Sequence, residues 1–92
     1  MVCKKCVIDG RVQGVYYRAT AAKRAHELAI KGHARNLPDG RVEVLAYGHP
    51  EAVETYISWL WIGSSAAKVI SVDVVEVALG PEQEIPEGFH TL

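Results

Sequence analysis

The sequence has no long apolar segment. The run Trp59-Leu60-Trp61-Ile62 is far shorter than the roughly 20 apolar residues that a membrane-spanning helix needs. The N-terminal lysines, Lys4 and Lys5, are not followed by the apolar stretch of roughly 7–15 residues that a secretory signal contains. We therefore expect a cytoplasmic protein with no membrane partner.

An excess of charge of one sign is also missing. The chain has 10 Lys and Arg residues against 11 Asp and Glu residues, a formal net charge of −1. Proteins that bind nucleic acid through its phosphates are usually strongly basic. The balance of charge therefore predicts no nucleic-acid partner.

Cysteine is scarce, with two residues in the segment Cys3-Lys4-Lys5-Cys6. Such a pair resembles half of a zinc site or a redox motif, but the four histidines of the chain are scattered. On a strand, an offset of three puts the two cysteines on opposite faces, where a disulfide or a shared metal is difficult. We interpret them as small apolar residues of a first strand and expect no metal, with a metal or redox site as the alternative.

The 92 residues suffice for one domain, 1–92, and glycine and proline divide it into elements. Apolar residues at helical spacing predict a helix over 19–30 that stops at Gly32, and Pro38-Asp39-Gly40 predicts a hairpin. The other expected elements are a strand at 6–12, hairpin strands at 33–37 and 41–47, a helix that begins at Pro50 and is closed by Gly63, and a strand at 68–79.

The last part of the chain is less regular. The apolar pattern of the strand at 68–79 changes face between Val74 and Val75, which is typical of a bulge or of an edge strand that twists away. A loop at 80–88 leads to residues 89–92, a candidate short fifth strand. The order β-α-β-β-α-β predicts an α+β, ferredoxin-like split βαβ fold with two helices on one face of an antiparallel sheet and the first and third strands as neighbours.

The segment Gly10-Arg11-Val12-Gln13-Gly14-Val15-Tyr16-Tyr17-Arg18 breaks a local rule. Arg18 falls in or next to the first helical turn, where the helix dipole disfavours cations, and no acidic residue follows until Glu27. A guanidinium, a helix N-terminus and loop N–H groups together favour a phosphate ligand. The alternative is that Gly10 and Gly14 only shape a turn and Arg18 is a solvated charge.

This string resembles the signature of the acylphosphatase family. A second block, Gly32-His33-Ala34-Arg35-Asn36-Leu37-Pro38-Asp39-Gly40-Arg41-Val42-Glu43-Val44, is also similar to that family. Gly48, Trp59-Leu60 and the valine-rich fourth strand follow in the expected order. The resemblance extends along nearly the whole chain.

The resemblance implies a hydrolase that converts an acyl phosphate to a carboxylate and inorganic phosphate without a metal or cofactor. It implies that Arg18 binds the phosphate and that Asn36 orients the attacking water. The residues implied to supply a backbone cradle for the substrate are Gln13, Gly14, Val15, Tyr16, Tyr17 and Arg18. We expect a small-molecule substrate as the only partner, and a monomer.

Two departures from the family pattern stand out. Position 17 is Tyr where the family usually has Phe, and we expect its hydroxyl to lie beside the cradle with little effect. Trp61 and Ile62 are apolar where the family tends to be polar. They either mark a contact surface or are ordinary scattered apolar residues, and we favour the second interpretation.

A noncatalytic module of the same fold is the alternative to an enzyme. Such a module would bind phosphorylated ligands or single-stranded RNA, with Tyr16 and Tyr17 stacking on bases. RNA-binding domains of this fold carry their aromatic residues on the central strands, whereas these tyrosines are expected at the helix entry.

Overall fold

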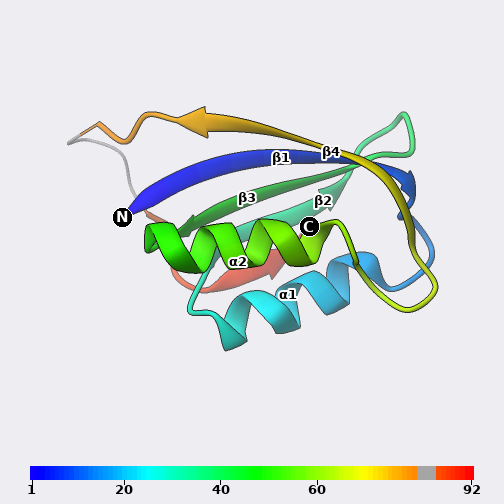
Figure 1. The fold of residues 1–92 in the computed structure, drawn as a ribbon, viewed down its shortest axis with the longest axis horizontal. Helices are drawn as coiled ribbons and strands as arrows, with labels where there is room; N and C mark the ends of the chain where they lie inside the picture. Colours follow the sequence, from blue (N-terminus) through cyan, green and yellow to red (C-terminus); the bar gives the residue numbers. More distant parts are fainter. Residues whose placement is uncertain (81–84) are drawn as a thin grey trace.

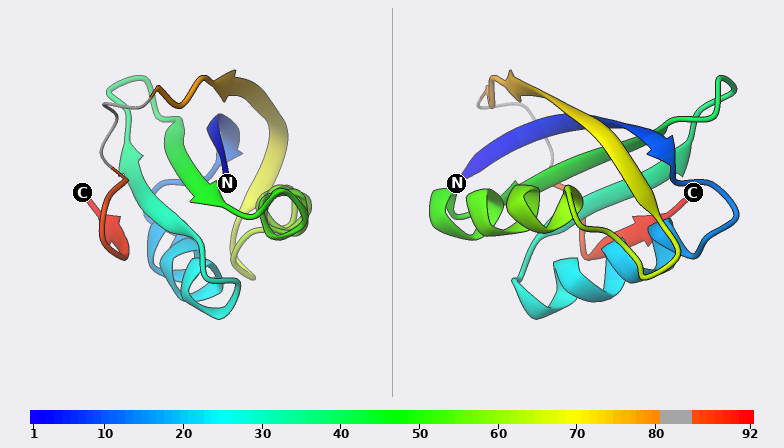
Figure 2. Two further views of the ribbon diagram at one scale, coloured as in Figure 1. Left: turned by 90° about the vertical axis from the view of Figure 1, so that its left-hand side faces the viewer. Right: turned by 45° about the vertical axis from the view of Figure 1, so that its right-hand side comes forward.

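The computed structural model describes residues 1–80 and 85–92 as a five-stranded sheet and two helices (Figure 1). The elements, in chain order, are β1 (Val2–Arg11), α1 (Tyr17–Glu27), β2 (Lys31–Asn36), β3 (Val42–Gly48), α2 (Pro50–Leu60), β4 (Lys68–Val77) and β5 (Phe89–Thr91). Both helices lie on one face of the sheet (Figure 2). Among the described residues, no helix has the length and apolar character needed to cross a bilayer.

The topology confirms the predicted fold class. The strand order is β4-β1-β3-β2-β5, so β1 and β3 are neighbours as expected. The pairs β1–β3, β1–β4 and β2–β3 are antiparallel, and the short fifth strand pairs parallel to β2. The predicted hairpin is therefore present, and residues 89–91 form the candidate last strand. Of the expected loop at 80–88, residues 81–84 lie outside the described part.

The first strand is longer than predicted because it begins at Val2 rather than at residue 6. Lys4 and Lys5 interrupt the apolar pattern, yet both pair with β3 and β4. Cys3 and Cys6 are both buried and free, and alternation along the strand puts them on opposite faces, as expected. Burial raises the pKa of the Cys6 thiol to about 12, so this thiol is protonated at neutral pH.

The first helix begins and ends earlier than predicted, at Tyr17 and Glu27 rather than at residues 19 and 30. Ala29, at φ 55°, leaves the helix in the left-handed region, and the N–H of Ile30 donates to the Ala25 carbonyl at 2.8 Å. Gly32 is therefore not the helix stop. It lies inside β2 at φ 139°, where an added Cβ would come within 1.8 Å of the Leu45 carbonyl oxygen on β3.

Gly32→Ala is expected to lower the free energy of unfolding by about 3 kcal/mol or more, because the new Cβ collides with backbone that cannot move without breaking the β2–β3 ladder. Gly80→Ala is the matched control, since a Cβ at Gly80 meets nothing within 4 Å. Urea unfolding of both variants measures the difference. Equal stability of the two variants would contradict the close approach at Gly32.

The last residue of α2 is Leu60, and Gly63 closes the helix as predicted. Gly63, at φ 71°, donates its N–H to the Trp59 carbonyl at 2.9 Å and so closes the helix end. Trp61 and Ile62 thus follow the helix rather than lying on it, and their side chains are 50% and 70% exposed. Their role as a contact surface or as scattered apolar residues stays a prediction.

The irregularity in β4 is not at Val74–Val75, where the pairing with β1 is regular. The register shifts instead between Asp9 and Gly10, which pair with Ser71 and Val69 and so leave Ile70 as the extra residue of a bulge. Gly10 occupies this place because an added Cβ would meet the Lys68 carbonyl oxygen at 2.1 Å. The other expectation for this segment, an edge strand, is confirmed, because β4 lies at one edge of the sheet and Val74 and Val75 are exposed there.

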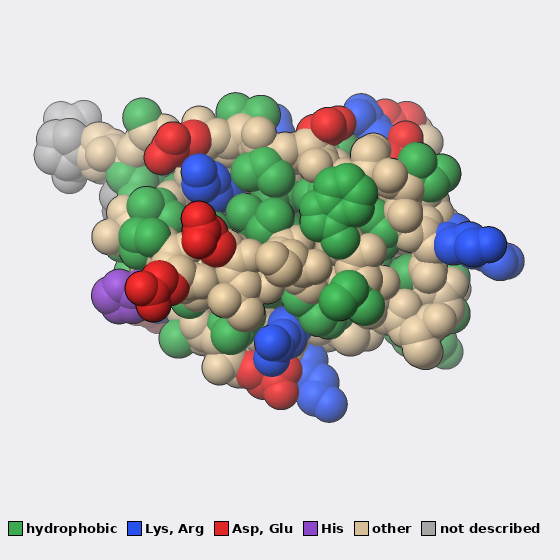
Figure 3. Space-filling view, in the orientation of Figure 1, with side chains coloured by type: hydrophobic (Ala, Val, Ile, Leu, Met, Phe, Trp, Pro, Cys, Tyr) green, Lys and Arg blue, Asp and Glu red, His purple; other side chains and the backbone are tan. Residues whose placement is uncertain are grey.

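The hydrophobic core lies between the sheet and the two helices. It includes Tyr17 and Ala25 from α1, Tyr56 and Leu60 from α2, and Cys6, Ile8, Val42, Val44 and Ala46 from the central strands. On the surface shown in Figure 3, acidic and basic side chains are interspersed rather than gathered by sign. This distribution agrees with the near-zero net charge.

A charged cluster lies on the face of the sheet opposite the helices. Glu43 of β3, only 9% exposed, accepts hydrogen bonds from Arg35 Nε at 3.0 Å and Arg35 Nη2 at 3.2 Å. His33 Nε2 lies 3.2 Å from the same carboxylate. Burial raises the pKa of Glu43, but the hydrogen bonds with Arg35 and His33 outweigh it, so the pKa lies below its usual value of 4.5.

Glu43→Gln is expected to lower the free energy of unfolding at pH 7 by about 1 kcal/mol, because Arg35 is half exposed and solvent weakens the pair. A carboxyl whose pKa is depressed in the folded state stabilises the fold above its unfolded pKa and loses that effect as pH falls through the folded pKa. Urea unfolding from neutral pH to about pH 3 should show the wild-type advantage shrinking below about pH 4.5. A constant advantage would contradict the ion pair.

Candidate active site

The loop between β1 and α1 encloses a pocket of about 330 Å³. The pocket is lined by Val12, Gly14, Tyr16, Tyr17, Arg18 and Ala19. Gly14 and Tyr16 adopt φ angles of 72° and 62°, and the left-handed Tyr16 directly precedes the helix. A non-glycine residue in this conformation is strained and often marks a functional site.

The pocket opens at a helix N-terminus that no acidic side chain caps. The first turn of α1 contains no Asp or Glu, and Tyr16 makes no side-chain capping bond. The first N–H groups of a helix have no partner inside the helix and carry partial positive charge. The pocket thus combines free donors with the Arg18 guanidinium, which is the environment predicted for an anion.

Arg18 is joined to the end of the chain. Its Nη1 donates to the backbone oxygen of Leu92, and the N–H of Leu92 donates to the Ala34 carbonyl at 2.9 Å. One bond to Leu92 leaves most of the five guanidinium donors for a ligand. The contacts also connect the arginine with β2, two residues before Asn36.

Asn36 is the last residue of β2 and its side chain is exposed. Ala34 belongs to the core between the sheet and the helices, so alternation puts Asn36 on the same face of the sheet. Leu92 contacts both Arg18 and Ala34, so it links Arg18 to the end of β2 that carries Asn36. The fold therefore brings the two residues predicted as catalytic to one end of one face.

The side chains of Gln13, expected only as part of the backbone cradle, and of Ser64 hold the pocket loop in place. Gln13 Nε2 donates to the carbonyl oxygens of Leu37 and Arg41, both at 2.9 Å. On the other side, the Ser64 hydroxyl donates to the Val15 carbonyl at 2.6 Å. The loop is thus tied both to the β2–β3 hairpin and to the segment after α2. A serine just after a helix-ending glycine carries no signal that would have predicted this contact.

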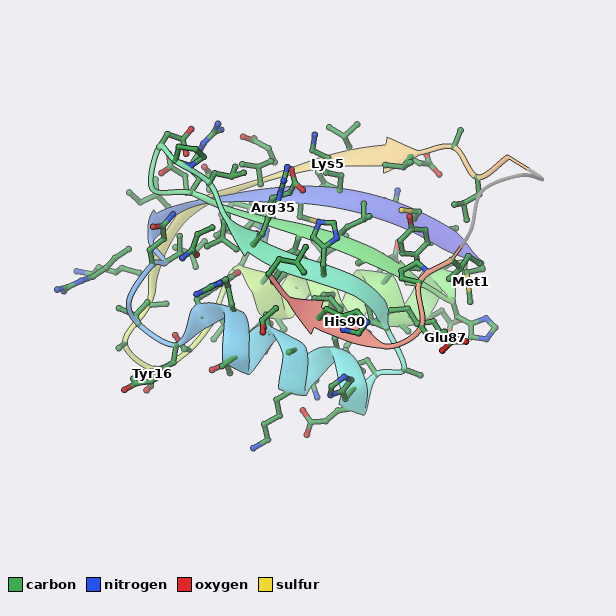
Figure 4. The ribbon with its side chains drawn as sticks, turned by 180° about the vertical axis from the view of Figure 1, so that it is seen from behind. Met1, Lys5, Tyr16, Arg35, Glu87 and His90 are labelled. Carbon is green, nitrogen blue, oxygen red and sulfur yellow. The ribbon has the colours of Figure 1, made fainter. Side chains whose placement is uncertain are left out.

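The expectation for the Tyr17 hydroxyl was wrong. Tyr17 is 1% exposed, stacks on Trp59, and donates its hydroxyl to the Leu60 carbonyl at 2.7 Å. The hydroxyl thus satisfies a carbonyl at the end of α2 rather than lying beside the cradle. Burial also excludes Tyr17 from stacking on a nucleic-acid base, as the binding-module alternative required. Tyr16 is 82% exposed at the outer end of the loop (Figure 4).

The site carries positive groups and no strong base or nucleophile among the residues that line the pocket. In the described ranges, no three or more His, Cys, Asp or Glu side chains gather as metal ligands. The arrangement can bind and polarise a phosphate, and Asn36 can position a small polar molecule through its amide. It suits chemistry on a substrate that is already activated.

The comparisons with known proteins agree on one family. The acylphosphatase family model matches residues 4–91. The chain is 49% identical over 79 residues to an acylphosphatase of Nitrosococcus oceani, which covers 84% of this chain and 89% of the relative. It is 50% identical over 84 residues to one of Thermus thermophilus, covering 91% of each.

A solved structure shows the same fold. The crystal structure of acylphosphatase from Bacillus subtilis superposes with a TM-score of 0.91 at 30% identity, over 100% of this chain and 99% of that chain. Sequence relatives, family model and structure thus agree along nearly the full length, with the Arg18 loop and the Asn36 strand inside the matched region. This chain belongs to the acylphosphatase family.

Proposed function

We propose that the protein hydrolyses the carboxyl–phosphate bond of acyl phosphates, with Arg18 and the loop backbone as the phosphate site and Asn36 as the residue that positions water. The observation that carries the proposal is the uncapped N-terminus of α1, where Arg18 and the loop enclose a pocket of about 330 Å³. Family membership supplies the reaction type.

The phosphate oxygens would be held by the guanidinium fork of Arg18 and by N–H groups from Gln13 to Arg18. Charge that develops on these oxygens as the bond breaks is stabilised by donors that are already in place. Water attacks phosphorus, the P–O bond to the acyl group breaks, and the electron pair leaves on the carboxylate. The products are one carboxylate and one dihydrogen phosphate, so a single water accounts for all atoms.

Asn36 would hold the water without deprotonating it. An amide offers a donor and an acceptor but is not a base near neutral pH, so a phosphate oxygen of the substrate takes the proton. An acyl phosphate is activated by its good leaving group, and positioning with charge stabilisation is sufficient for catalysis. We also propose that the chain forms one domain and is cytoplasmic. We propose that it works as a monomer, since no step of the reaction needs a second copy of the chain.

The purified protein is expected to hydrolyse a small acyl phosphate in the presence of excess chelator and to leave a simple phosphate monoester intact. The monoester has a poorer leaving group, which this site has no acid to protonate. Release of inorganic phosphate measures both reactions. Loss of turnover with chelator, or equal rates on the two substrates, would contradict the proposal.

A further inference from the structure

The side chain of Gln13 makes a contact that a backbone cradle does not need. Its amide nitrogen donates to two carbonyl oxygens, those of Leu37 and Arg41, both at 2.9 Å. Carbonyls only accept, so the NH₂ group must face them and both of its hydrogens are used. Gln13 lies in the pocket loop, and both acceptors lie in the β2–β3 hairpin.

The two acceptors form the base of the hairpin turn. The N–H of Leu37 donates to the Arg41 carbonyl at 2.8 Å, and the N–H of Gly40 donates to the Leu37 carbonyl at 3.1 Å. Leu37 directly follows Asn36 in the chain. The Gln13 amide is therefore one residue away from the backbone that carries Asn36.

We propose that the Gln13 side chain is a positioning residue that fixes Asn36 relative to the phosphate cradle. The inference rests on the proposed function, in which the loop holds the phosphate and the end of β2 holds the water. These parts belong to separate elements, so the distance from water to phosphorus depends on what joins them. Gln13 joins them directly, and a misplacement of about 1 Å in such a geometry can cost about 10²-fold in rate.

Gln13→Met keeps the length of the side chain and removes both donors. Leu37 and Arg41 retain their bonds within the hairpin, so the turn should persist. We expect kcat for acyl phosphate to fall about 10–100-fold, while the inhibition constant of inorganic phosphate, which reports the cradle, changes less than about threefold.

A double-mutant cycle separates this role from general loosening of the loop. If Gln13 acts through Asn36, adding Gln13→Met to Asn36→Ala should lower kcat no further than about twofold. Ser64→Ala is the matched variant, because it removes a tether of the same loop that leads away from the hairpin. Its effect should multiply with that of Asn36→Ala.

Three results would overturn the inference alone: unchanged kcat in Gln13→Met, a weakening of phosphate binding as large as the loss of kcat, or equal coupling of Gln13 and Ser64 to Asn36. A wild-type chain without acyl phosphate turnover would overturn the proposed function and this inference with it. Circular dichroism and thermal unfolding of each variant show that the fold is retained when kinetics are compared.

Discussion

Arg18→Ala is expected to lower kcat/KM for acyl phosphate hydrolysis by about 10³-fold, because it removes the charged fork that holds the phosphate in both the bound substrate and the transition state. Inorganic phosphate should lose most of its inhibition as well. Steady-state kinetics with competing phosphate measure both effects.

The control for this variant is Lys23→Ala. Lys23 is exposed on the same helix, so the change removes the same charge from α1 but not from the pocket. We expect kcat/KM within about twofold of wild type, since Lys23 does not line the pocket and solvent weakens the effect of its exposed charge on a bound phosphate. Arg18→Lys retains charge but not the planar fork, and should recover only part of the loss. Full activity in Arg18→Ala would contradict the assignment.

Asn36→Ala should lower kcat by about 10²–10³-fold, the usual cost of removing one positioned hydrogen-bonding group. Here inhibition by inorganic phosphate should stay close to wild type, because Asn36 holds the water rather than the phosphate. The two variants should therefore affect different quantities. Arg18→Ala should weaken phosphate binding and lower turnover, whereas Asn36→Ala should lower turnover alone.

Two further variants test the chemistry at Asn36. Asn36→Asp keeps the shape but presents a carboxylate to a dianionic substrate, so activity should stay low if the amide is required. Lys31→Ala, at the other end of β2, controls for strand stability, since Lys31 is exposed and does not line the pocket. Wild-type kcat in Asn36→Ala, or weaker phosphate binding that matches the loss of kcat, would contradict a role in holding water.

The order of elements was predictable because local signals mark them. Alternation, helical spacing and Asp39-Gly40 act over a few residues and do not depend on distant neighbours. Errors occurred where a distant neighbour decides. Gly32 resembles a helix stop in the sequence, but its position is decided by β3, which packs against it. The change of face at Val74–Val75 predicted a bulge or an edge strand; β4 is an edge strand, and its bulge lies at Ile70, where β4 passes Gly10.

The candidate site shows the same division. The motif around Arg18 and the one around Asn36 each stand out in the sequence. The 17 residues between Arg18 and Asn36 do not by themselves say how close the two side chains lie. The strand pairing and the contact of Arg18 with Leu92 bring them to one end of the sheet. Pairing between β2 and β5 is a tertiary event that no local pattern encodes.

The sequence by itself determined the fold class, the family and the residue types available for chemistry, since these depend on periodicity and on motifs of short range. Only the tertiary structure decided which hydrogen-bonding groups of those residues are engaged in contacts and which remain available to a ligand. It directs the Tyr17 hydroxyl into the core against Leu60, and the Gln13 amide onto the hairpin that carries Asn36. The hydrogen-bond partners of these side chains lie on other elements, which come close only when the chain folds. The roles of the side chains therefore follow from packing.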